Sequence, residues 1–147
     1  MRHSDRGKAA LIAWAIVCYC LSLCPLAAGA AVIIVNESVP AERYSRADTR
    51  AIFAMRQRLW PNGEQIKVFT LADDHPIHKD FVKNNLRMFP HQFRRVWDRM
   101  TYTGTGVAPI QLDSEQEMIE KIMNTPNAIG YVDKLPRHAK IRLFGYH

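Results

Sequence analysis

The pattern of hydrophobic and polar positions predicts a mixed α/β fold of one domain. Runs of β-branched, aliphatic and aromatic residues predict strands, at 31–35, 66–71, 128–132 and 141–144. Between these runs, apolar residues recur every three or four positions, which predicts helices that begin near Ser45, Pro76, Pro90 and Ser114. The predicted order is one strand, one helix, one strand, three helices and two strands, joined by short connections.

The first predicted helix has a clear start. Ser45 and Asp48 have the spacing of a capping pair, in which each side chain binds the backbone of the other residue. The apolar spacing predicts a buried face, formed by Ala47, Ala51, Ile52 and Met55. Phe53 is predicted near the edge of that face, and the helix is predicted to end between 56 and 59.

The stretch 66–86 predicts a strand, a polar turn and a helix. Asp73 and Asp74 supply the turn and the helix cap. Pro76 suits the first helical turn, because its missing N–H is not needed there. In α/β proteins such turns place ligands against free backbone N–H groups, so this turn is the first candidate site.

The same turn also suggests a metal site, because Asp73, Asp74, His75 and His78 lie within six residues. The alternative is a set of helix-capping carboxylates and solvent-exposed helix histidines. We favour that alternative, since no distant ligand can be identified, and predict neither a metal nor a cofactor.

The first 30 residues have the composition of a cleavable secretory signal peptide. Three basic residues precede an apolar run at 9–23, which is shorter than the roughly 20 residues that span a bilayer. Small residues at 28–30 predict cleavage after Ala30, and an uncleaved membrane anchor is the alternative. The predicted domains are a signal peptide at 1–30 and an α/β domain at 31–147, exported to the periplasm.

Composition excludes several functions for the exported domain. All three cysteines lie within 1–30, so the domain has no disulfide and no thiol chemistry. Residues 1–30 hold three of the 20 Lys and Arg and one of the 14 Asp and Glu, which leaves a net charge of +4 with histidines neutral. Because the basic residues are dispersed, we predict no nucleic-acid partner. No nucleophile elbow, phosphate loop or dinucleotide fingerprint is present, so we predict no enzymatic activity.

Three segments occur in an order that is typical of a known family. They read T-R-A-I-F and W-P-N-G at 49–53 and 60–63, then the strand, turn and helix of 66–81, then N-A-I-G-Y-V at 127–132. Together they resemble the phosphate-type periplasmic solute-binding proteins of ABC transporters (PstS-like), which have the type II periplasmic-binding fold. That fold has two α/β lobes with the ligand between them. This chain is roughly half as long, so the resemblance implies a single lobe with a mixed sheet flanked by helices.

The resemblance also implies a ligand site at the turn. Family members that bind phosphate carry Ser-Gly-Thr at the start of the helix after the turn, where hydroxyls and free amides hold the oxyanion. The matching positions, 73–77, contain no Ser, Thr or Gly; the proline removes a donor and the two aspartates repel phosphate. At this position we predict contacts from Asp74, His75 and Lys79.

A second candidate site is the loop after the third predicted helix. Thr103, Gly104, Thr105 and Gly106 could hold an anion through backbone N–H groups, with Arg94, Arg95 or Arg99 adding charge. The alternative is a plain loop beside a solvent-exposed basic helix face. Gly130, by contrast, is interpreted as permitting close packing within a strand.

Two functions follow from these observations. The first is an exported, non-enzymatic solute-binding-like protein that binds phosphate or a related small oxyanion for an ABC-type importer. The second is a periplasmic interaction or scaffold protein that has lost its ligand. A single lobe exposes its former cleft face, which would suit a homodimer or a partner in the envelope.

Overall fold

The computed structural model describes residues 30–145. The predicted signal peptide, apart from Ala30, therefore lies outside the described residues, and its cleavage stays a prediction. Within the described part, no helix is both long enough and apolar enough to cross a membrane.

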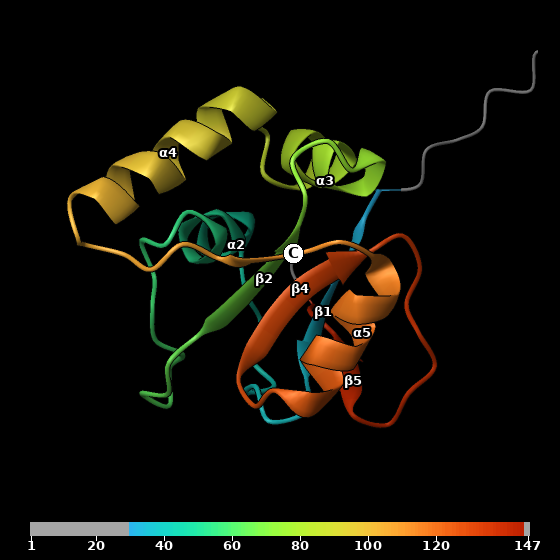
Figure 1. Ribbon diagram of the computed structural model, residues 1–147. Coiled ribbons are helices and arrows are strands. Elements are labelled where there is room, and N and C mark those ends of the chain that lie inside the picture. Colours follow the sequence, from blue (N-terminus) through green and yellow to red (C-terminus); the bar gives the residue numbers. More distant parts are fainter. Residues whose placement is uncertain (1–29, 146–147) are drawn as a thin grey trace, which may run out of the picture.

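Five strands form one mixed sheet (Figure 1). They are β1 (Val32–Asn36), β2 (Lys67–Leu71), β3 (Ile110–Leu112), β4 (Ala128–Val132) and β5 (Ile141–Leu143). Their order across the sheet is β3-β2-β4-β1-β5. β2 runs parallel to β3 and β4, whereas β1 runs antiparallel to β4 and β5. The carboxyl ends of β2, β3 and β4 therefore meet at one edge of the sheet.

The helices begin at the predicted residues or one position after them. They are α2 (Arg46–Phe53), α3 (Pro76–Asp80), α4 (Pro90–Tyr102) and α5 (Glu115–Asn124), and the π-helical segment η1 (Phe81–Asn85) continues α3. The Ser45 side chain accepts a hydrogen bond from the Asp48 N–H at 3.1 Å, and the Asp48 carboxylate accepts one from the Ser45 N–H at 2.8 Å. The predicted capping pair is confirmed.

Helices cover both faces of the sheet (Figure 1). α5 packs on one face, where a Cβ added to Gly130 would lie 2.4 Å from Sδ of Met118, so the interpretation of Gly130 is confirmed. On the other face, Tyr131 stacks on Phe81 with ring centroids 3.9 Å apart. Phe53 meets Phe81 edge-on at 4.7 Å. These three rings join β4, η1 and α2 in the core.

The structure corrects four details of the predicted elements. β3 is absent from the predicted order, because three residues are too few for an alternating pattern to show. α2 ends at Phe53 rather than between 56 and 59. Phe53 is fully buried instead of lying at an edge, and Ala47, predicted to be buried, is exposed. The buried face of α2 centres on Thr49, Ile52 and Phe53 and points at the aromatic rings of the core.

Candidate functional site

The carboxyl edge of the parallel strands is where this kind of fold holds a ligand. At this edge an aspartate follows each strand, namely Asp73 and Asp74 after β2, Asp113 after β3 and Asp133 after β4. α5 also begins here, with Glu115 and Glu117 in its first turn. The edge is therefore acidic, and it would repel a phosphate.

Two of these carboxylates occupy backbone donors that a bound oxyanion would use. Glu115 Oε2 accepts a hydrogen bond from the Asp133 N–H at 2.6 Å. Glu117 Oε2 accepts one from the Asp113 N–H at 3.1 Å. The chain thus satisfies the amides at the ends of β4 and β3 with its own side chains, and these amides are not free for an anion.

Asp73 connects α4 to the sheet. Its carboxylate accepts hydrogen bonds from Nη1 of Arg94 and from Nε2 of Gln111, both at 3.2 Å. Nε of Arg94 also lies 3.3 Å from Oδ1 of Asp98. The Arg94 guanidinium is therefore shared between two carboxylates, and it is not a free cation.

His78 and Tyr131 form a buried polar pair beneath Asp73. Nδ1 of His78 lies 2.5 Å from the Tyr131 hydroxyl, which accepts a hydrogen bond from the Leu71 N–H at 2.9 Å. The hydroxyl has one proton of its own, which it can donate to Nδ1 while it accepts from Leu71. Nε2 of His78, on the other side of the ring, lies 3.8 Å from Oδ1 of Asp73.

His78 is only 1% exposed, so the prediction of a solvent-exposed helix histidine is wrong for this residue. Its burial lowers the pKa of His78 below the ordinary histidine value, against the opposing effect of Asp73. Burial also raises the pKa of Tyr131. Both groups are therefore neutral in the folded protein near pH 7, as a buried hydrogen-bonded pair requires.

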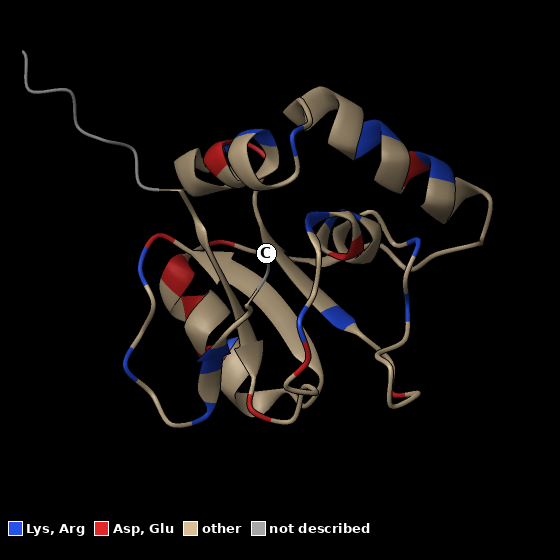
Figure 2. Ribbon diagram, turned by 180° about the vertical axis from the view of Figure 1, so that it is seen from behind, with Lys and Arg blue, Asp and Glu red and all other residues tan. Residues whose placement is uncertain are grey.

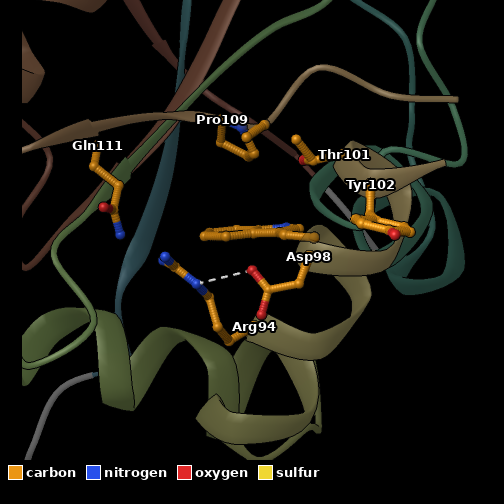
Figure 3. Close-up of a pocket in the computed structure, with 8 residues that line it drawn as sticks. Arg94, Asp98, Thr101, Tyr102, Pro109 and Gln111 are labelled. Carbon is orange, nitrogen blue, oxygen red and sulfur yellow. Dashed lines mark ion pairs between the residues drawn. The ribbon is translucent and has the colours of Figure 1, made fainter. Parts of the chain in front are cut away.

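A pocket of about 380 Å³ opens beside Arg94 (Figure 3). It is lined by side chains of α4 and of the segment that leads into β3, namely Arg94, Trp97, Asp98, Thr101, Tyr102, Ala108, Pro109 and Gln111. Figure 3 shows Arg94 and Asp98 paired at the side of the pocket. The single lining cation is matched by Asp98 and by the nearby Asp73, so the pocket lacks the positive charge that a phosphate would need.

The predicted turn residues Asp74, His75 and Lys79 do not line the pocket of Figure 3. His75, rather than an aspartate, is the N-cap of α3, and its Nδ1 accepts a hydrogen bond from the Ile77 N–H at 3.3 Å. Asp74 and Lys79 are exposed. Across residues 30–145, no three His, Cys, Asp or Glu side chains are grouped so that they could hold a metal ion.

The predicted loop site is the C-terminal cap of α4. The N–H of Gly104 donates to the Thr101 carbonyl at 3.1 Å, and the N–H of Thr105 donates to the Met100 carbonyl at 3.1 Å. Gly104 has the left-handed φ of +67° that this Schellman cap requires. The N–H groups of the other two predicted residues, Thr103 and Gly106, also donate to α4 carbonyls. All four backbone donors are engaged, so the structure gives no support to an anion cradle in the loop.

Arg99, the remaining predicted residue, lies in a different groove on α4. This groove of about 400 Å³ is lined by Arg56, Gln92, Arg95, Val96, Arg99 and Met100, and we call it the arginine groove. Within residues 30–145, none of its three guanidinium groups makes an ion pair. Figure 2 shows the basic segments of α4 interrupted by a single acidic one. That acidic residue is Asp98, which forms an ion pair with Arg94.

Arg56 was not predicted as a site residue, and Arg95 was predicted only as possible added charge for the loop. Gln92, Arg95 and Arg99 are spaced to lie on one helical face, which is a signal that the sequence contains. Arg56 follows α2 and lies about 40 positions earlier, so only the folded chain brings it beside them.

Comparisons with known proteins identify the fold. No protein-family profile and no curated protein matches the sequence. Three solved structures are similar. The first is a putative phosphate ABC transporter substrate-binding protein from Clostridium perfringens with bound phosphate. The match covers 80% of this chain and 44% of that protein, with 13% identity and a TM-score of 0.63. The match to PstS from Borrelia burgdorferi covers 80% of this chain and 47% of that protein, with 15% identity and a TM-score of 0.56. The match to an ABC-type phosphate transport receptor from Vibrio cholerae covers 80% of this chain and 46% of that protein, with 12% identity and a TM-score of 0.53.

These matches confirm the fold that the resemblance implies. The described part of the chain has the mixed α/β fold of one lobe of these binding proteins. The chain spans slightly less than half the length of each of the three proteins. At 12–15% identity, the matches establish the fold alone.

Proposed function

We propose that this chain is an exported, non-enzymatic solute-binding-like protein, and that it binds a small oxyanion such as phosphate in the arginine groove. The observation that carries the proposal is the set of three guanidinium groups without carboxylate partners around one groove, Arg56, Arg95 and Arg99. The expected membrane partner is an ABC-type importer, since the structural neighbours are transport receptors.

The difference in charge favours the arginine groove over the acidic edge of the sheet as the anion site. The groove is lined by three cations and no acid. The pocket of Figure 3 has one cation that is already shared by two carboxylates. Hydrogen bonds between a guanidinium and an oxyanion are charge-assisted and contribute about 1.5–3 kcal/mol each. An anion therefore gains several such contacts in the groove, whereas at the edge it meets repulsion.

Calorimetric titration with phosphate and with sulfate tests this proposal. We expect saturable binding at millimolar concentration or tighter. Arg95→Ala and Arg99→Ala should each weaken it about tenfold or more, since tenfold is about 1.4 kcal/mol. Arg137→Ala, which removes an exposed cation from the loop before β5, is the matched control and should bind as the parent does. If neither anion produces heat, or if all three variants bind alike, the proposal is wrong.

A second candidate function is an envelope interaction or scaffold protein that has lost the ligand. One observation favours it: Glu115 and Glu117 occupy amides at the edge where this fold holds solutes. A protein of this kind would be indifferent to anions and would form a stable complex, with itself or with another envelope protein. Sizing and thermal denaturation, each with and without phosphate, distinguish the two functions. A solute-binding protein should melt at a higher temperature with phosphate, because a ligand that binds only the folded state stabilises it. A scaffold protein should form a stable complex and melt at the same temperature with and without phosphate.

A further inference from the structure

A groove of about 420 Å³ lies beside the first residues of β2. It borders the arginine groove, because Met55 directly precedes Arg56 and a Cβ on Gly106 would lie 3.3 Å from Cβ of Met100. It is lined by the end of α2, the start of β2 and the segment that leads into β3. We call it the Met55 groove. It shares Ala108 and Pro109 with the pocket of Figure 3 but none of that pocket's charged residues. It shares no residue with the arginine groove.

The Met55 groove has an apolar lining. Ile52, Met55 and Ile66 are buried members of the hydrophobic core that reach it from α2 and from the start of β2. Val107 and Ile110 also line it, yet they are 82% and 56% exposed. Large apolar side chains that stay exposed beside an apolar groove leave surface that a ligand could bury, at about 25 cal/mol per Å².

The charges of the groove are all of one sign. Arg58 and Lys67 are the only charged residues that line it, and both are exposed. Nη1 of Arg58 donates to the Thr105 carbonyl at 2.9 Å, which holds the guanidinium beside the groove and leaves its other donors available. In the described part of the chain, neither cation makes an ion pair.

Backbone strain marks the same place. Met55 has a φ of +59°, the left-handed conformation that favours glycine. It occupies the position after the α2 cap, where the N–H of Met55 donates to the Ile52 carbonyl at 3.0 Å. A residue with a side chain costs about 1–2 kcal/mol in this conformation. This conformation caps α2, and it leaves the Met55 side chain 5% exposed as part of the groove lining.

We propose that the Met55 groove binds an amphiphilic monoanion, a molecule with an apolar chain or ring and one carboxylate. The apolar body lies against Met55 and Ile66, under the exposed Val107. The carboxylate lies between Arg58 and Lys67, because a single anionic group complements two cations without a competing acid. This site is independent of oxyanion binding in the arginine groove.

The test uses three probes with the same chain length: decanoate, decanol and decyltrimethylammonium, all below their micelle concentrations. Backbone amide resonances of the ¹⁵N-labelled protein report where each probe binds. We expect decanoate to shift the amides of Val68, Val107 and Ile110 with saturation. Decanol should bind at the same place at least about tenfold more weakly, since the charge-assisted contacts with Arg58 and Lys67 are lost. The cationic probe should leave these amides unchanged.

Two pairs of variants complete the test. Arg58→Gln with Lys67→Gln should reduce decanoate affinity to that of decanol, whereas Lys134→Gln with Arg137→Gln, which removes two exposed cations elsewhere, should leave it unchanged. Ala108→Trp should block all binding in the groove while phosphate binding persists, and thermal melting confirms that it folds. The proposal is overturned if decanoate shifts other amides, or if it binds the double glutamine variant as tightly as the parent. It is also overturned if sedimentation shows a dimer that Ala108→Trp dissociates, because a second copy would then cover the groove.

Discussion

The Tyr131 hydroxyl and Nδ1 of His78 lie 2.5 Å apart in the core, and the same hydroxyl accepts the Leu71 N–H. One oxygen atom thus connects β4 to β2 and to α3. Above this pair, Asp73 holds Arg94 of α4. The pair therefore sets the position of the turn on which the fold family would build a ligand site.

Tyr131→Phe should destabilise the protein by about 1–3 kcal/mol, because the Leu71 N–H and Nδ1 of His78 both lose their buried partner. The ring itself, stacked on Phe81, is retained. Urea denaturation measures the effect. Tyr44→Phe is the control, since the Tyr44 hydroxyl makes only one hydrogen bond, a long one of 3.5 Å. Equal stability of the parent and Tyr131→Phe would show that the buried pair contributes nothing.

The stability of the fold should fall at mildly acidic pH because of His78. Burial lowers the folded-state pKa of His78 below the unfolded value of 6.5, while Asp73 opposes the shift. The unfolded chain therefore binds more protons below about pH 6.5, so the free energy of unfolding decreases as the pH falls through that range. Above it, this contribution is fully present.

His78→Asn removes this titration. Its free energy of unfolding should be lower than that of the parent at neutral pH and should depend less on pH between about pH 7 and pH 5. Chemical denaturation at a series of pH values measures both slopes. The same slope in the variant and the parent would contradict the assignment to His78.

Gly104→Ala should cost about 1–2 kcal/mol through the backbone alone. A Cβ at this position would meet no atom within 4 Å, so steric overlap plays no part, but the φ of +67° disfavours alanine. Gly104→Asn, which tolerates this conformation better, should cost less. Thermal denaturation ranks the three proteins. Because the loop caps α4, phosphate affinity should be the same in all three proteins. A lower affinity of Gly104→Ala for phosphate would show that the loop takes part in anion binding.

Gly130→Ala should destabilise the fold by about 1–3 kcal/mol, since the added Cβ would lie 2.4 Å from the buried Sδ of Met118. The second variant, Met118→Ala, leaves a cavity by itself. Combined, the two changes should cost less than the sum of their separate effects, because the removed side chain makes room for the new methyl group. Strict additivity in this double-mutant cycle would show that α5 and β4 are not in close contact at this point.

Much of the fold could be predicted because its signals are local. Ser45 and Asp48 define a helix start within four residues, and the first strand shows as a run of β-branched residues. β3 gives no such signal, because its place in the sheet depends on pairing with β2, about 40 positions earlier along the chain. Phe53 was predicted from its own helix, but its burial is decided by Phe81 and Tyr131.

The site could be predicted less well, for a physical reason. The sequence shows that Asp73 and His78 belong to a turn and a helix. Their roles come from Arg94 and Gln111, which bind Asp73, and from Tyr131, which binds His78; these partners lie 21 to 53 positions away. The four amides of the loop at 103–106 look free in the sequence, but the preceding helix uses them. Arg99 lines a groove together with Arg95, which the helical spacing of the sequence already places on the same face, and with Arg56, which only the fold brings there. That Arg99 contacts an anion stays a prediction.

The most direct test of oxyanion binding in the arginine groove is a phosphate titration that follows the side-chain Nε–H resonances of the arginines by ¹H–¹⁵N NMR. We predict saturable shifts for Arg56, Arg95 and Arg99. Arg94, whose Nε is paired with Asp98, should serve as an internal control and stay unchanged. Shifts at Arg94 with none at Arg95 and Arg99, or no saturable shift at any arginine, would contradict the proposed function.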